Sequence, residues 1–562
     1  MDEDECDTIL CLIDELKSED HTTKLNAINS LETIAQVIGQ ERTRDELIPY
    51  TAELLDDDNE ETLIAIATKL GDLSKFVGDP SHMVCLLPPL NTLASNEENN
   101  VREKAVLSLN KIAEKFPRKV IEESYLPVLN SLATNDWYSS RIASCSLFST
   151  IFNKLAEDQQ LELIKLFVTL GKDDTPMVRR AAAANMGNMC SVVSNADLGR
   201  LLETLSIDEH DSVRQATLES IAKVIRKYKD LIQLVKKMTK DKSWRVRYTL
   251  VEHLNEFLEP FESANNIVNE VVALINDSEP EVKCITLASL PQIIQKLDKN
   301  SVEVYIMPSF EKLSKDPSQY VRLSLVQAIC QTSNYFEVEI AVQKLLPIIN
   351  TLIKDDSFDV RISFADNMHA FNASIGAEKV LNYSIPLIVQ MMKDNQWRLR
   401  LKVVECLPQV AEMIGPNSFN EHISDSLVKW IEDSVYTVRE ATLESIKQIA
   451  SMFGESWIKL RVLPVIQELV KNPVFTKRMT ALSAINKFGE LLGSKEFCSL
   501  IEILADDSVP NIKFNTAKMI KKHAKIKGQN FTKVLEKLKG DQDFDVKFFA
   551  EEALKEISNK RN

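Results

Sequence analysis

The most frequent functional pattern in the sequence is a pair of oppositely charged residues. An acidic residue is followed, about six residues later, by an aliphatic residue and a base, as in DDTPMVRRA around Arg179 and DDSFDVR around Arg361. From Lys283 to Arg478, the five steps between successive bases are 39 residues each. Carboxylates and guanidinium groups form strong, charge-assisted hydrogen bonds. If the repeats stack, these residues predict a line of such bonds between neighbouring repeats.

Catalysis and metal binding have few candidate residues. No Gly-x-Gly-x-x-Gly, Walker loop or Gly-x-Ser-x-Gly motif occurs, and no histidine forms His-x-x-x-His or joins a cysteine pair. The nine cysteines, from Cys6 to Cys498, contain no Cys-x-x-Cys, which indicates a reducing compartment. We therefore predict no catalytic residue, no metal site and no cofactor. The isolated histidines are His21, His82, His210, His253, His369, His422 and His523.

Composition limits the fold class. Only 13 of 562 residues are glycine, which argues against a large β protein or a doubly wound nucleotide-binding enzyme. A hydrophobic fraction of 44% indicates a folded chain, so the composition favours an all-α protein. The net charge of −16 argues against nucleic acid as a partner. No apolar stretch is long enough to span a membrane, and MDEDEC does not resemble a signal peptide. A cytoplasmic location is expected, with the nucleus left open.

Prolines recur in phase with the charged pairs, mostly within apolar strings such as YLPVL and LLPII. Proline lacks the N–H and crowds the preceding turn, so it kinks a helix. Each unit is therefore predicted to be a kinked first helix, a turn with the acidic residue, and a second helix that begins at the Val-Arg. Asp and Asn residues before the Val-Arg are expected to be the N-caps of that helix. The prolines are Pro49, Pro88, Pro127, Pro308, Pro347, Pro386 and Pro464.

The repeat extends over almost the whole chain. Counting back by 39 residues from Arg102 reaches Leu63 and then Lys24, which brings the number of units to fifteen. Units of this length built from helix pairs are HEAT repeats, which bury their apolar faces only by stacking on their neighbours. The prediction is a single all-α domain over residues 1–562, a right-handed α-solenoid of about fifteen HEAT repeats forming a curved, elongated horseshoe.

Aromatic residues collect at one position of the repeat, three residues before the base. They occupy seven of the thirteen positions from Asn99 to Phe544, although aromatics are 7% of the chain. Each ring could cover its own turn, or the row could form a ridge that binds other proteins, since aromatics and arginine dominate interface hot spots. Trp430 and Trp457 lie within helices and are predicted to be core residues. The aromatic row is Tyr138, Trp244, Phe358, Trp397, Tyr436, Phe475 and Phe544.

Several strings resemble the scaffold subunits of type 2A protein serine/threonine phosphatases. These strings are ERTRDELIPY (41–50), CLLPPL (85–90), DDTPMVRRAAA (173–183), DKSWRVRY (241–248) and DQDFDVKFFAEEAL (541–554). The similarity runs from about Leu12 to Leu554. It implies a platform for a variable regulatory subunit in residues 8–300 and one for the phosphatase catalytic subunit in residues 390–555.

The resemblance also implies binding residues at the turns. Those for the regulatory subunit would include Trp137, Pro176, Met177, Arg180, Trp244 and Arg245. Those for the catalytic subunit would include Trp397, Arg398, Tyr436, Phe475, Asn511 and Phe544. Lys477 departs from the pattern because it stands where most units have an aliphatic residue.

The resemblance implies a non-catalytic scaffold in a core heterodimer or a heterotrimer. Catalysis and metals would come from the catalytic partner, and substrate choice from the regulatory one. A HEAT-repeat nuclear transport receptor, or another solenoid adaptor, is the alternative from a different class. Co-purification of phosphatase activity, as opposed to a small GTPase, would separate the two hypotheses.

Overall fold

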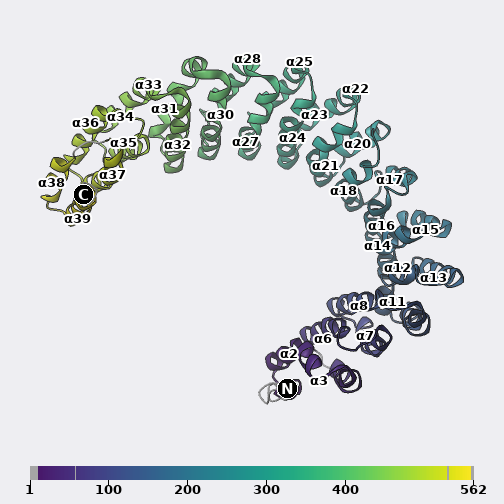
Figure 1. Cartoon of the computed structure of the whole chain (residues 1–562). Helices are drawn as coiled ribbons and strands as arrows, with labels where there is room; N and C mark the ends of the chain where they lie inside the picture. Colours follow the sequence, from purple (N-terminus) through teal and green to yellow (C-terminus); the bar gives the residue numbers. More distant parts are fainter. Residues whose placement is uncertain (1–10, 57–58, 528–530, 559–562) are drawn as a thin grey trace. The chain divides into compact units, whose positions relative to one another are not determined.

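The computed structural model describes residues 11–56, 59–527 and 531–558. Within these ranges every regular element is helical and no strand is assigned. The chain divides into two compact units, Met1–Lys296 and Leu297–Asn562. In each unit, the first helices of successive repeats form one row and the second helices form another (Figure 1). The prediction of an all-α solenoid is confirmed.

The second helices of the repeats number eight in the first unit and seven in the second, along the described residues. In the first unit they are α2 (His21–Asn29) with α3 (Leu31–Ile38), α6 (Glu60–Leu73), α8 (Asn99–Ala113), α11 (Tyr138–Ser144) with α12 (Phe148–Phe152), α14 (Pro176–Val192), α16 (Asp211–Val224), α18 (Trp244–Glu252) with α19 (Leu254–Leu258), and α21 (Pro280–Ile293). In the second unit they are α24 (Gln319–Thr332), α27 (Phe358–Ile375), α30 (Trp397–His422), α32 (Tyr436–Phe453), α35 (Phe475–Phe488), α37 (Pro510–Lys527) and α39 (Phe544–Ser558).

The first helices are shorter and often built from several segments. In the first unit they are α4 (Gln40–Arg42) with α5 (Ile48–Glu53), α7 (Leu87–Ala94), α9 (Arg118–Val120) with α10 (Leu126–Ala133), α13 (Glu157–Leu170), α15 (Ala196–Ser206), α17 (Ile232–Met238) and α20 (Val268–Ile275). In the second unit they are α22 (Lys299–Ser301) with α23 (Met307–Leu313), α25 (Val338–Ile340) with α26 (Leu346–Leu352), α28 (Ala377–Lys379) with α29 (Ile385–Met391), α31 (Ser424–Lys429), α33 (Glu455–Trp457) with α34 (Leu463–Leu469), α36 (Ser494–Ala505) and α38 (Thr532–Lys539). A break at Gly415, whose φ is 76°, makes the end of α30 part of the following first helix.

The recurring prolines produce the predicted kinks through π-helical segments. Proline offers no N–H and crowds the carbonyl four residues back, so nearby bonds shift register. In the first case, the Ile48 N–H before Pro49 bonds to the Thr43 carbonyl, five residues back. Pro88 differs, because it follows the 3-10 segment η3 (Pro80–Leu86). The π segments end two residues before the other prolines and are η1 (Thr43–Leu47), η4 (Ile121–Tyr125), η8 (Val302–Ile306), η10 (Ala341–Leu345), η11 (Val380–Ser384) and η13 (Ile458–Val462).

The second helices begin two residues earlier than the Val-Arg pattern predicts. Helix α14 begins at Pro176, although its Val-Arg is Val178-Arg179. The prediction of Asp and Asn N-caps is confirmed for α2 and α6, whose N-caps are Asp20 and Asn59, but it is wrong for α14, whose N-cap is Thr175 with Asp173 two residues before it. The aromatic row therefore lies at the first residue of the second helices.

The core lies between successive repeats, as the apolar spacing predicts. Val101, Ala105, Leu109 and Ile112 along one face of α8 are completely buried. Helix α8 packs against α6 of the preceding repeat and α7 of its own. Trp430 and Trp457 are buried, which confirms them as core residues.

Candidate partner-binding edge

Most turns between the two helices are closed by an aspartate of the turn, and a few by an asparagine. In the turn before α14, the Thr175 N–H donates to Asp173 Oδ1 at 2.8 Å. Arg179 Nη1 donates to the Asp173 carbonyl at 2.9 Å and to the Asp174 carbonyl at 3.1 Å. These bonds satisfy turn groups that would otherwise lack partners, and they fix where the second helix begins.

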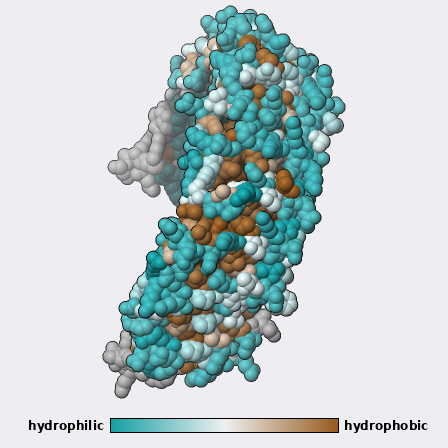
Figure 2. All heavy atoms as spheres, turned by 90° about the vertical axis from the view of Figure 1, so that its right-hand side faces the viewer, coloured by the Kyte–Doolittle hydropathy of each residue, from teal (hydrophilic) through white to brown (hydrophobic). Residues whose placement is uncertain are grey.

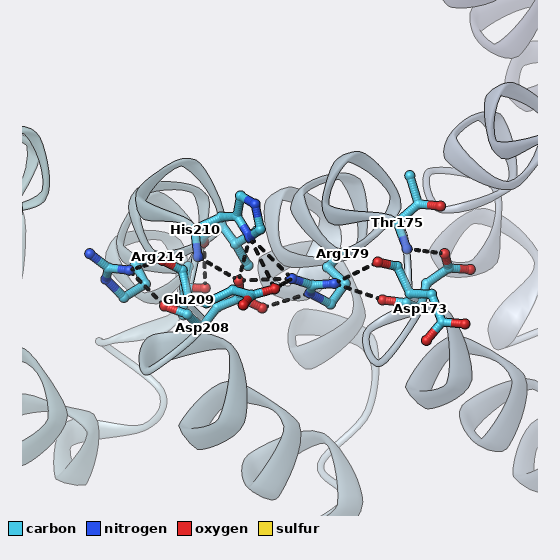
Figure 3. Close-up of polar contacts among 10 residues, drawn as sticks. Asp173, Thr175, Arg179, Asp208, Glu209, His210 and Arg214 are labelled. Atoms are coloured by element: carbon cyan, nitrogen blue, oxygen red, sulfur yellow. Dashed lines mark hydrogen bonds and ion pairs between the residues drawn. The ribbon is translucent and has the colours of Figure 1, made fainter.

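In most repeats the same residues also join one turn to the next. Arg179 donates from Nε to Asp208 Oδ2 at 2.7 Å and from Nη2 to Asp208 Oδ1 at 3.1 Å, a bidentate pair (Figure 3). We call this set of ion pairs between turns the ladder, and it confirms the predicted line of charge-assisted hydrogen bonds. The other pairs in the first unit are Arg141–Asp173, Arg214–Asp241 and Arg247–Asp277. Those in the second unit are Arg322–Asp355, Arg361–Asp394, Arg400–Asp433, Arg478–Asp507 and Lys513–Asp541.

Six of the ladder carboxylates have a pKa below the ordinary value. Burial alone raises the pKa of Asp208, but the hydrogen bonds from Arg179 and from the His210 N–H outweigh it and hold that pKa below its ordinary value. The same balance lowers the pKa of Asp433, which is bonded by Arg400 and the Val435 N–H. The pKa values of four other ladder carboxylates are also lowered, those of Asp277, Asp355, Asp507 and Asp541.

The ladder is interrupted once within the described part of the second unit. Asn472 occupies the acidic position, and its Oδ1 still accepts the Val474 N–H at 3.0 Å. Arg439 donates to its own turn, at the carbonyls of Asp433 and Ser434. Its guanidinium carbon also lies 5.6 Å from the centre of the Tyr436 ring. No ion pair joins Arg439 to the next turn in residues 297–527.

The predicted binding residues lie in rows, because the second helices begin at the same position of successive repeats. We call these rows the turn edge. In the first unit it comprises Trp137, Tyr138, Pro176, Met177, Arg180, Trp244 and Arg245. In the second unit it comprises Phe358, Trp397, Arg398, Tyr436, Phe475, Asn511 and Phe544.

Several aromatic side chains of the turn edge are open to solvent. Trp137 is 66% exposed, Tyr436 is 66% exposed and Phe544 is 78% exposed. Rings covering their own turns would be mostly buried, so these three favour the interpretation as a binding ridge. Met177, Phe475 and Asn511 are exposed as well, whereas Pro176 is half-buried.

The two Trp-Arg pairs differ from this picture. Trp244 and Trp397 are both half-buried. The guanidinium carbon of Arg398 lies 4.7 Å from the Trp397 ring centre, and that of Arg245 lies 5.0 Å from the Trp244 ring centre. Each arginine thus covers part of its neighbour by a cation–π contact. Each pair offers a partner one stacked surface that combines charge and ring.

Tyr320 is an exposed turn residue that the sequence analysis missed. It is 67% exposed and lies two residues before Arg322, one position after the aromatic row. The signal for it was the aromatic letter inside DPSQYVR.

The described residues contain no metal-binding cluster. No group of three or more His, Cys, Asp or Glu side chains there is placed to hold a metal ion. No disulfide joins the eight cysteines in those residues, while Cys6 lies outside them. No helix there is both long and apolar enough to cross a membrane.

Comparison with known families identifies the class of repeat. A family profile described as "PIK3R4-like, middle domain" matches residues 13–205 and 309–487, which is about two thirds of the chain. The chain belongs to this family. A second profile, "PPP2R1A-like HEAT repeat", matches residues 263–334, so the prediction of HEAT repeats is confirmed.

Curated relatives support the resemblance noted from the sequence. A probable serine/threonine-protein phosphatase PP2A regulatory subunit of Caenorhabditis elegans is 46% identical over 216 residues, 38% of this chain and 36% of the relative. The protein phosphatase 2A scaffold subunit of Dictyostelium discoideum is 47% identical over 190 residues, 34% of this chain and 32% of the relative. The matched stretches thus span about a third of these relatives' length. The predicted similarity to the type 2A scaffold subunits is confirmed.

Solved structures with the same fold include a karyopherin. The crystal structure of Kap121p bound to RanGTP aligns with a TM-score of 0.66 at 15% identity, over 96% of this chain and 58% of that chain. At this identity the likeness shows the fold alone.

Proposed function

We propose that the protein is a non-catalytic scaffold of a type 2A phosphatase. The turn edge of residues 390–555 holds the catalytic subunit, and the turn edge of residues 8–300 holds a variable regulatory subunit. The core heterodimer and the heterotrimer are its assemblies, and the cytoplasm is its main location. The protein itself needs no cofactor.

The observation that carries this proposal is the exposure of large side chains at equivalent positions of the repeat. Tyr436 and Phe544 project from the first residues of α32 and α39, on backbone that the ladder holds. Exposed aromatics on preorganised backbone have the properties of interface hot spots. The relatives named as phosphatase 2A scaffold or regulatory subunits supply the class of partner.

Binding to a purified type 2A catalytic subunit tests the proposal. Replacing both Tyr436 and Phe544 by Ala is expected to weaken this binding by at least about 30-fold, the result of losing a hot spot of about 2 kcal/mol. Tyr383→Ala is the matched control, because Tyr383 is an exposed aromatic of the same unit outside the turn edge. Equal binding by the double variant and the control would contradict the C-terminal platform.

The regulatory platform is tested in the same way. Trp137→Ala is expected to weaken binding of a regulatory subunit and to leave binding of the catalytic subunit unchanged. Leu107→Ala is its control, since Leu107 is an exposed apolar residue of α8 away from the turns. If the protein retains a Ran-type GTPase but no phosphatase subunit, the transport-receptor alternative replaces the proposal.

A further inference from the structure

A groove runs between two first helices of the first unit, α15 and α17. Its volume is about 780 Å³. Its walls come from both helices and from the two segments that precede them, around Asn195 and Tyr228. A smaller groove of about 280 Å³ adjoins it, since Ile207, Leu234 and Lys237 line both.

The floor of the groove is apolar. Ile207, at the end of α15, is 79% exposed, and it is flanked by half-buried Leu231 and Leu234. Figure 2 shows hydrophobic residues gathered in the middle of the face on which these first helices lie. An exposed apolar surface within a hollow, bordered by polar residues, is typical of a protein-binding groove.

The repeats that form the groove are shortened. Two of the repeat steps here, before Arg214 and Arg247, are 35 and 33 residues in place of 39. The first helix of the later repeat consists of η5 (Lys229–Leu231) and α17, which has seven residues. Its neighbour α15 has eleven residues.

The rim of the groove is basic, although the whole chain carries −16. Four bases line it, Arg226, Lys227, Lys229 and Lys237, against the acids Glu203 and Asp230. The segment that surrounds it, residues 223–240, contains seven basic residues and one acidic residue.

Three of these bases are partly engaged within the protein. Lys229 Nζ lies 6.0 Å from the centre of the Phe261 ring. Arg226 pairs with Glu259 at 2.8 Å, and Lys227 Nζ donates to the Cys190 carbonyl at 3.1 Å. Lys237 is exposed at the junction of the two grooves, beside Ile207 and Leu234. An apolar floor with a basic rim complements a ligand that is apolar on one face and acidic on the other.

We propose that this groove binds an acidic amphipathic helix of a partner protein. Apolar residues of that helix enter between α15 and α17, and its carboxylates face Lys237 and Lys229. The inference does not depend on the proposed phosphatase function, because it concerns a different surface and needs no phosphatase subunit.

A designed peptide tests this site on the full chain. The probe is a fluorescent helix with Leu at positions i, i+3, i+4 and i+7 and Glu on its other face. Ile207→Asp and Lys237→Glu are each expected to weaken its binding by at least tenfold. Leu107→Asp is the matched control and should leave the affinity unchanged. Both apolar targets are largely exposed, so the substitutions leave the core intact.

Charge is tested with a second peptide in which Lys replaces every Glu. It is expected to bind at least tenfold more weakly, and raising the salt concentration should weaken only the acidic probe. The proposal is overturned if the acidic probe does not bind, or if Ile207→Asp and Leu107→Asp bind it equally. Anionic vesicles that bind with the same dependence on Ile207 and Lys237, without peptide binding, would assign the groove to a membrane surface.

Discussion

Replacing Asp433 by Ala removes both roles of a ladder residue. The carboxylate accepts the Val435 N–H at 2.9 Å within its own turn. It also accepts Arg400 Nε at 2.8 Å and Nη2 at 3.0 Å from the preceding repeat. The side chain of Asp433 is 5% exposed and that of Arg400 is 12% exposed, so solvent replaces these bonds poorly.

The expected loss of stability is local and about 3 kcal/mol. Breaking a buried ion pair by removing one partner costs about 3–5 kcal/mol. Arg400 moderates this cost, because its Nη1 remains bonded to the Asp394 carbonyl at 3.0 Å. Asp433→Asn keeps an oxygen for the Val435 N–H and loses the charge, so it should cost about half as much.

Hydrogen exchange along the chain measures this effect, because a solenoid opens locally and not as one unit. Amides of α30 and α32 should exchange roughly 100-fold faster in Asp433→Ala, the equivalent of about 3 kcal/mol. The control is Ser434→Ala, since Ser434 is an exposed residue of the same turn. Equal exchange in the Ala variant and this control would refute a stabilising role for the ladder.

Three further predictions follow from the same structure. Asn472→Asp supplies the missing ladder carboxylate, so it should raise the free energy of local opening of α32 and α35 by about 0.5–1 kcal/mol and slow their hydrogen exchange. Unchanged exchange would contradict the interpretation of Asn472 as the interruption of the ladder. Because the pKa values of ladder carboxylates such as Asp208 and Asp433 are lowered, their stabilisation is present above the unfolded pKa of about 3.9 and is lost as the pH falls through the folded values; the thermal midpoint should therefore fall as the pH drops below about 4, and a level midpoint would contradict this. Trp397→Ala should weaken binding of the catalytic subunit by about 2–4 kcal/mol and leave binding of the regulatory subunit intact. If the thermal midpoint falls and the binding of both subunits weakens, Trp397 is a packing residue.

Periodicity predicted most of the fold. The 39-residue steps, the proline positions and the apolar spacing of α8 predicted the helix pairs, the kinks and the buried face. The start of the second helix was predicted two residues too late, because an aspartate before a helix is compatible with two geometries. Asp173 bonds the N–H of the N-cap residue itself, and only the three-dimensional turn distinguishes this from capping.

The turn edge was predictable as a row, and its exposure was less so. An aromatic residue at a fixed position of the repeat does not reveal whether its ring is exposed to solvent, as in Tyr436, or half-buried beside a neighbouring arginine, as in Trp397. That depends on side-chain conformation. The groove at Ile207 was missed because it forms between side chains of two neighbouring helices, for which the shortened steps were the only sequence signal.

The two roles of the acidic residue are separable, and the second unit shows which one positions the turn edge. Every turn there keeps the bond within the turn, including the one where Asn472 replaces the acid. The acceptors are Asp316, Asp355, Asp394, Asp433, Asn472, Asp507 and Asp541.

The ion pair, in contrast, is lost at Asn472, although Phe475 still begins α35 at the usual place and is 46% exposed. Closure of the turn therefore suffices to present an edge residue, and the ion pair adds stability between repeats. It follows that Asp433→Asn should retain the contribution of Tyr436 to partner binding, while Asp433→Ala should lose part of it. If the two variants bind the catalytic subunit equally weakly, the ion pair and not the turn positions the edge.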